Sequence, residues 1–436
     1  MNTQSRNGDI PHFLVTIDRA PAPSRPFADC DKEMRNVPIS RLMAAAPHRL
    51  LFLVGAGNVL AAMSWWAAWL LATRWQVLDL PQPPLPAGWM HAVIMQYHVL
   101  PSFIFGFLLT VFPRWMGLAP LPASHYLPVG AGLLGGQVVT LFGLWGNLPL
   151  LQAGALLTLA GWTVGMVLLA RLALRAKELP WHPLSCLLAL SFGLVGLVFY
   201  ALLTFRVDAK VAFVVIKFGA VAMLLPIYFT VCHRMIPFFT QVILPGREMP
   251  RPMWILAAAW GLFVAHLWLE LRHAYGWLWL PDLALFVMFA GMLVFWWPRE
   301  RVPALLRVLH LGFAWLPLAF GLYAWQSAWF AISGQFLLGR APAHALFIGF
   351  FGSLLVAMVT RVTQGHSGRP LVLGPVAAAA FVIVQLVAVT RVVAESMPDA
   401  LAWQAVAALG WLVAFLPWVV RSAWIYLTPR ADGKPG

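Results

Sequence analysis

Long apolar runs, separated by short polar or proline-containing stretches, make up the chain from about residue 49 onward. A helix of about 20 predominantly apolar residues is long enough to cross the hydrocarbon core of a bilayer. The pattern therefore predicts an all-α, polytopic membrane protein with twelve transmembrane helices in one bundle. We expect the spans at residues 49–73, 88–112, 125–145, 148–174, 183–205, 211–233, 252–271, 275–297, 304–331, 341–362, 371–394 and 400–427.

The two ends of the chain depart from this apolar pattern. Residues 1–46 are polar, rich in proline and arginine, and lack the apolar segment of a cleavable signal peptide. We therefore predict a disordered cytoplasmic tail there. The membrane domain is expected to occupy residues 47–428, and residues 429–436 are expected to form a short C-terminal tail.

Lysine and arginine are distributed unevenly between the two sides of the predicted bundle. With the N-terminus inside, the inward loops hold twelve of these residues and the outward loops hold six. Positive charge collects on the cytoplasmic side of membrane proteins, so we predict that both termini are cytoplasmic. The net charge of +14 fits this distribution. Because the basic residues form no patch interleaved with aromatic residues, a lipid bilayer is the expected partner and nucleic acid is not.

Composition supports the same class of protein. The chain is 61% hydrophobic and only 10% charged, whereas soluble domains average about 25% charged residues. The three cysteines, Cys30, Cys186 and Cys232, are far apart in the sequence and form no CxxC pair. This spacing argues against both a disulfide framework and a thiolate metal site.

Histidines are the most informative polar residues, because few other ionisable side chains fall inside the predicted spans. A polar side chain in hydrocarbon costs free energy, so an ionisable residue at that depth favours a functional interpretation. With the predicted orientation, one layer of histidines lies toward the outer surface. It consists of His91, His98, His266 and His344.

A second layer of histidines lies toward the inner surface. It consists of His233, His310 and His366. Arg234, Arg361 and Arg369 are expected nearby, and arginines suit the propionates of a haem. Imidazole is a common ligand for haem iron and for copper, so either layer is a candidate cofactor site. Alternatively, each histidine only bonds a neighbouring helix or lies at the headgroup boundary.

Other polar residues in the spans give weaker evidence about function. Met95 shares a helical face with His91 and His98 and is a further candidate metal ligand, although methionine also fills gaps in cores. The acidic residues Glu270, Asp282, Glu395 and Asp399 are predicted near span ends, which argues against a proton pump or proton-coupled carrier. Lys217 is expected either to extend toward the surface or to neutralise an anion such as a haem propionate.

Four stretches in this order resemble the NnrS family of haem- and copper-containing membrane proteins. The longest is AHALFIGFFGSLLVAMVTRVTQGHSGRPL at residues 343–371, which is similar to the family's run from a helical histidine to a GHTGRP-type loop. The others are HRMIPFFTQ at 233–241, GFLLTVFPRWMG at 106–117 and VLHLGFAWLPLAFGL at 308–322. Together they span most of the chain.

The resemblance is carried over residue by residue. The matching positions are His344, His366, Arg369, Arg234, Met235, Ile236, Pro237 and His310. His91 and Met95 match the first histidine and the methionine of the family's HAHEM-like element. There the chain departs from the family, because Val93 and Ile94 replace the second histidine and the glutamate. Either a ligand is lost or His98 takes its place.

The resemblance implies a bacterial inner-membrane protein that binds haem, of b type, together with copper. It also implies a role in the response to nitric oxide or nitrosative stress, with nitric oxide or another small diatomic molecule as ligand. The cofactor-binding candidates are His91, His98, His310, His344, Arg234 and Arg369. The metal-binding candidates are His91, His98, His233, His266, His344 and His366. Neither a catalysed reaction nor an electron donor follows from these residues.

Three alternatives remain open at this point. An enzyme resembling the haem–copper oxidases also has twelve spans, but this chain has no adjacent pair of histidines and no deep carboxylate. A membrane transporter fits twelve spans, although a midplane acidic site and broken helices are not evident. A cofactor-assembly factor that passes haem or copper onward has the same sequence features as a protein that retains them.

Overall fold

The computed structural model describes residues 37–433. Residues 1–36, which make up most of the predicted N-terminal tail and include Cys30, and residues 434–436 lie outside the described part. The described residues are helical and contain no strand. Twelve of their helices are long and apolar enough to cross a membrane. The predicted all-α, twelve-span fold is therefore confirmed, and the chain is a multi-pass membrane protein.

Nine spans are regular α-helices. They are α3 (Pro47–Trp75), α6 (Ala123–Gly143), α7 (Leu148–Arg175), α8 (Trp181–Phe205), α11 (Met253–Leu271), α12 (Trp279–Trp296), α13 (Ala304–Ser333), α16 (Pro375–Val393) and α17 (Ala400–Tyr426). Short 3₁₀ turns precede α12 as η3 (Tyr275–Trp277) and follow α16 as η5 (Ala394–Ser396). Before the first span, α2 (Ile39–Met43) packs on α3 and buries Leu42 and Met43.

Three spans each contain a π-helical segment between two α-helices. The second span is α4 (Ala87–Ile94), η1 (Met95–Val99) and α5 (Leu100–Trp115). The sixth is α9 (Ala209–Lys217), η2 (Phe218–Leu224) and α10 (Leu225–Ile243). The tenth is α14 (Ala341–His344), η4 (Ala345–Gly352) and α15 (Ser353–His366).

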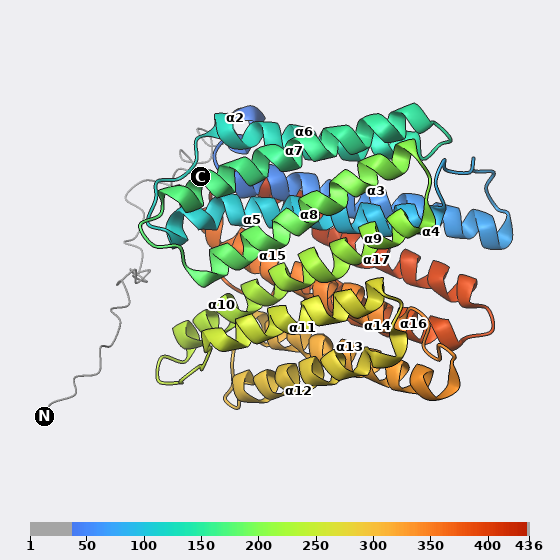
Figure 1. The fold of residues 1–436 in the computed structure, drawn as a ribbon. Helices are drawn as coiled ribbons and strands as arrows, with labels where there is room; N and C mark the ends of the chain where they lie inside the picture. The colour runs from blue at the N-terminus through green and yellow to red at the C-terminus, as the bar shows by residue number, and fades with distance from the viewer. Residues whose placement is uncertain (1–36, 434–436) are drawn as a thin grey trace, which may run out of the picture.

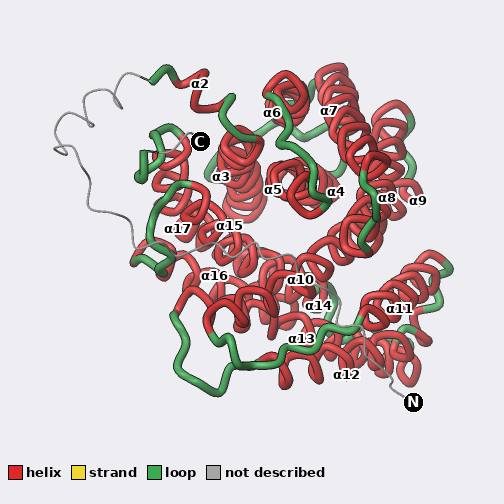
Figure 2. Tube along the Cα trace, turned by 90° about the vertical axis from the view of Figure 1, so that its left-hand side faces the viewer, coloured by secondary structure: helices red, strands yellow, loops and turns green. Residues whose placement is uncertain are grey.

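The spans lie side by side and alternate in direction, so that α3 begins and α17 ends at the same end of the bundle (Figure 1). We call this the terminal end and the opposite one the far end. Seen along the helices, the second span is packed among α3, α6, α7 and α8, and the tenth among α13, α16 and α17 (Figure 2). The most apolar windows of these two spans are 83% buried, against 33% for the seventh and eighth. The second and tenth spans therefore form the core.

The sixth span is longer than the sequence pattern predicts. It was expected to end at His233, but α10 continues to Ile243 through Arg234 and Pro237. The charge is accommodated because the Arg234 guanidinium lies over the ring of Trp115, 4.4 Å from its centroid, and a cation over an aromatic face is stabilised. His233 consequently lies inside a helix, where it is fully buried.

Small residues bring α6 and α7 into close contact. A Cβ atom added to Gly132 would lie 2.4 Å from Cα of Gly161, and one added to Gly154 would lie 2.3 Å from Oγ1 of Thr140. Small residues allow the backbones of transmembrane helices to approach closely. This approach places Thr158 of α7 at the interior of the bundle, where it contacts the second span.

Candidate functional site

The three π-helical segments coincide with the chemistry-bearing residues of the spans. His98 lies within η1, Lys217 immediately precedes η2, and His344 immediately precedes η4. A π-helical turn widens the backbone by one residue, shifts the phase of the side chains that follow, and occurs frequently at functional sites. This feature was not predicted, because the spans are apolar along most of their length and a shift in side-chain phase is then not visible in the hydrophobic pattern.

His91 of α4 and His344 of α14 both lie toward the far end of the bundle, the layer in which both were predicted (Figure 1). The His91 ring stacks on Trp66 of α3, with centroids 4.3 Å apart and planes at 12°. Arg340 immediately precedes α14, and Arg391 lies in α16, which packs against α14. Two imidazoles from different spans and two arginines therefore lie toward the same end of the bundle.

The hydrogen bonds of His344 fix which ring nitrogen is free. Its Nδ1 lies 2.9 Å from the carbonyl oxygen of Arg340. A carbonyl only accepts, so Nδ1 carries the proton and Nε2 presents a lone pair. His310 is held in the same way by the carbonyl of Leu306, at 3.1 Å. An Nδ1–H bond to a backbone carbonyl is the arrangement that orients metal-ligating histidines.

His98 occupies a different environment from His91, although the sequence placed the two on one helical face. Its ring is fully buried, and its Nε2 lies 3.1 Å from Oγ1 of Thr158. Asn58 donates to its backbone carbonyl. Because η1 begins between the two histidines, the side chains that follow it are rotated relative to His91. The structure ties His98 to α7 through Thr158.

His266 is engaged at both ring nitrogens. Its Nδ1 lies 2.6 Å from Oδ1 of Asp282, and its Nε2 lies 3.5 Å from Oε2 of Glu270. Oε1 of Glu270 in turn lies 2.5 Å from Nζ of Lys217. Both carboxylates are buried. They were expected near span ends, and sequence reasoning did not foresee that they would point into the bundle.

The predicted inner layer is divided among separate places at the terminal end. The His366 ring packs on His48, with centroids 4.5 Å apart. His233 pairs with His182, whose Nε2 lies 3.0 Å from Nδ1 of His233. His310 lies apart from both pairs, beside Trp297. His48 is the second residue of α3 and His182 is the second residue of α8, so each lies where its span begins at the terminal end.

The arginines expected beside the inner histidines are also at the terminal end. Arg361 lies over Phe239, at 3.9 Å from the ring centroid, and Arg369 lies over Trp424 at 5.1 Å. Burial, followed by the neighbouring Arg421, lowers the pKa of Arg369. These cations are therefore at the opposite end from His91 and His344. The far-end cations Arg340 and Arg391 share the depth of His344, a signal that the sequence contained but that was not used.

Larger metal-ligand clusters are not found in residues 37–433: no group of three or more histidine, cysteine, aspartate or glutamate side chains is arranged to hold a metal ion. The described histidines instead include two ring-to-ring pairs, His48 with His366 and His182 with His233. Two histidines are sufficient to hold a haem, and imidazole is also a ligand for copper.

One comparison with known proteins gave a match. The model of a family described as NnrS protein matches residues 42–430 of the 436-residue chain. The match covers all twelve spans. No curated protein matched the chain, and no solved structure matched it.

Proposed function

Because the chain belongs to the NnrS protein family, we propose that it is a haem- and copper-binding protein of the bacterial inner membrane that acts in the response to nitric oxide or nitrosative stress. Its family and its twelve spans are consistent with a function related to nitric oxide. The proposal includes cytoplasmic termini, which the distribution of basic residues supports. The observation that supports the proposal is the presence of His91, His344, Arg340 and Arg391 at the same end of the bundle, with Nδ1 of His344 bonded to the carbonyl of Arg340.

The residues at the far end fit a haem. The free Nε2 of His344 is oriented by the bond from Nδ1 to Arg340, and His91 is held flat against Trp66. Arg340 and Arg391 supply positive charge for two propionates. Arg391 is already bonded to Glu395, at 2.6 Å, which fixes its guanidinium in place. Bound haem would supply an iron atom that binds nitric oxide.

Copper is proposed at the terminal end. His182 and His233 approach each other through ring nitrogens, and copper sites use two or three imidazoles. The pair is buried by α8 and α10, with the hydrogen-bonded hydroxyls of Ser185 and Thr230 on the same two helices. These residues would hold the ion away from water, and the two sites would lie at opposite ends of the bundle.

Absorption spectra of the oxidised and reduced protein, with metal analysis, test the proposal. His91→Ala and His344→Ala are expected to abolish or shift the haem bands, because each removes an imidazole that would hold the haem. His125→Ala, at an exposed position on α6, is the matched control and should leave the spectrum unchanged. Haem bands that survive unaltered in both far-end variants would refute the assignment of these ligands.

Copper is tested separately. His182→Ala and His233→Ala are expected to lower the copper content and to leave the haem bands intact, since they lie at the other end of the bundle. Unchanged copper content in both variants contradicts the second site without affecting the first.

A further inference from the structure

Four ionisable side chains form a continuous network near the far end, on three neighbouring spans. Lys217 of the sixth span contacts Glu270 of the seventh, Glu270 faces His266 one turn earlier on the same helix, and His266 contacts Asp282 of the eighth. His266, Glu270 and Asp282 are buried, at 2%, 4% and 0% exposure. Lys217 is a quarter exposed, with 24% of its side-chain surface accessible, and connects the network to the surroundings.

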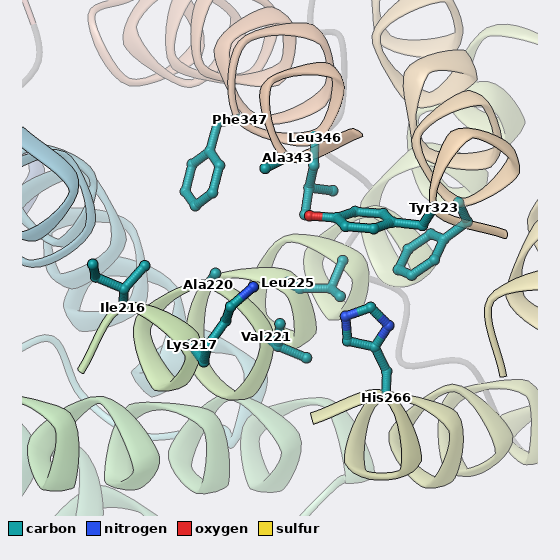
Figure 3. Close-up of a pocket in the computed structure, with 11 residues that line it drawn as sticks. Ile216, Lys217, Ala220, Val221, Leu225, His266, Tyr323, Ala343, Leu346 and Phe347 are labelled. Atoms are coloured by element: carbon teal, nitrogen blue, oxygen red, sulfur yellow. The ribbon is translucent and has the colours of Figure 1, made fainter. Parts of the chain in front are cut away.

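A cavity of about 60 Å³ adjoins this network. Lys217 and His266 line it on one side, and Tyr323 of α13 lines it on another. Figure 3 shows the lysine nitrogen, the imidazole and the phenol oxygen directed toward the same space. The tenth span closes the cavity with apolar side chains, including Ala343, the residue before His344. A buried water needs at least about 10–15 Å³ and polar partners, so the cavity is large and polar enough for water.

The network is not fully satisfied by its own members. Within the described residues, Oδ2 of Asp282 is buried without a hydrogen bond, and Oε2 of Glu270 has only the 3.5 Å ion-pair contact with Nε2 of His266. A buried carboxylate oxygen that lacks a donor is costly, and ion pairs that only hold helices together are expected to be saturated. These oxygens belong to a network that borders the cavity through Lys217 and His266, an arrangement that suits the binding and release of protons.

We propose that Lys217, Glu270, His266 and Asp282 form a proton-transfer site that connects the far-end surface with the adjoining cavity. A proton on Glu270 passes to Nε2 of His266 while the proton on Nδ1 passes to Asp282. The net change is one proton moved from Glu270 to Asp282. The imidazole keeps one proton, which is on Nε2 after the transfer instead of Nδ1. The proposal does not depend on a bound haem or metal.

Within the described residues, four charged or titratable side chains face His266. Lys217 faces it from the sixth span, Glu270 from its own helix and Asp282 from the eighth span. Tyr323 faces it from the ninth span, with the rings 5.4 Å apart. The tenth span presents only apolar side chains to the cavity. Any proton bound here at reduced pH is therefore shared among these groups.

Infrared difference spectroscopy tests the proposal on the full-length protein in phosphatidylcholine vesicles, between neutral and acidic buffer. The wild-type protein is expected to show a protonated-carboxyl band at the frequency of a buried group, which shifts in deuterated buffer. Glu270→Gln or Asp282→Asn should remove or shift this band. Asp399→Asn, at an exposed ion pair with Arg74, should change only the solvated-carboxyl region.

The result that overturns the proposal is a spectrum without a buried-carboxyl band, or one in which the band is identical in the wild type and in both variants. If Glu270→Gln fails to fold, Glu270→Asp keeps the charge and moves the carboxyl by one methylene. The band should then persist at a changed frequency, and an unchanged band also overturns the proposal. Haem content has no bearing on either outcome, so this test is separate from that of the proposed function.

Discussion

Removing the positive charge of Lys217 should destabilise the protein more than removing the negative charge of Glu270. Lys217→Met leaves the carboxylate of Glu270, which is 4% exposed, facing only His266. Glu270→Gln instead leaves a lysine that is already a quarter exposed and is able to extend toward water. Removing one partner of a buried ion pair, so that the other charge is left buried and unpaired, costs about 3–5 kcal/mol of stability.

The expected magnitude follows from this asymmetry. Because Lys217 is partly solvated, we take the lower limit and expect Lys217→Met to reduce the free energy of unfolding by about 3 kcal/mol. That corresponds to roughly a hundredfold change in the ratio of folded to unfolded protein. Glu270→Gln should cost about 1 kcal/mol, the value of an ordinary hydrogen bond. The double variant should cost less than the sum, because neither charge is then stranded.

Equilibrium unfolding in mixed micelles of lipid and denaturing detergent provides the assay. The effect of Lys217→Met should shrink as the pH is lowered, since a protonated Glu270 needs no counter-ion. Arg74→Met, which breaks the exposed pair with Asp399, is the matched control and should have little effect. A loss for Lys217→Met no larger than that for Glu270→Gln would refute the reasoning.

Two further predictions concern the packing around the second span. Gly132→Ala should destabilise the α6–α7 contact by about 1–3 kcal/mol, because the added Cβ would lie 2.4 Å from Cα of Gly161. Gly135→Ala is the control and should be tolerated, because its Cβ would have its nearest neighbour at 3.9 Å. Equal unfolding curves for the two variants would contradict this. Thr158→Val removes the hydroxyl bonded to His98 and should lower the free energy of unfolding by about 1–2 kcal/mol. Haem content should stay constant. Loss of haem from a folded variant would show that His98 takes part in haem binding.

The twelve-span fold could be predicted from the sequence, and the reason is physical. A bilayer offers no hydrogen-bond partner to the backbone, so an apolar run of sufficient length has to be a helix. Depth also follows, because a residue's position along a span fixes its height at a constant rise per residue. His91 and His344 were therefore expected at the same depth, and the structure places the helices that carry them, α4 and α14, toward the same end of the bundle.

Lateral neighbours were decided only by the tertiary structure. Periodicity within one helix does not say which other helix it faces, so the inner histidines were expected in one layer and are found as His48–His366, as His182–His233 and as a separate His310. The π-helical segments changed the side-chain phase within the second, sixth and tenth spans.

The buried acids illustrate the same division. The sequence located Glu270 and Asp282 near the ends of their spans, and they are there. Only the packing of the sixth, seventh and eighth spans turned both carboxylates inward, onto Lys217 and His266. Hydrophobicity along the chain determined what enters the membrane and how deep each residue lies. Contacts between helices, whose partners are distant in sequence, determined which polar groups meet.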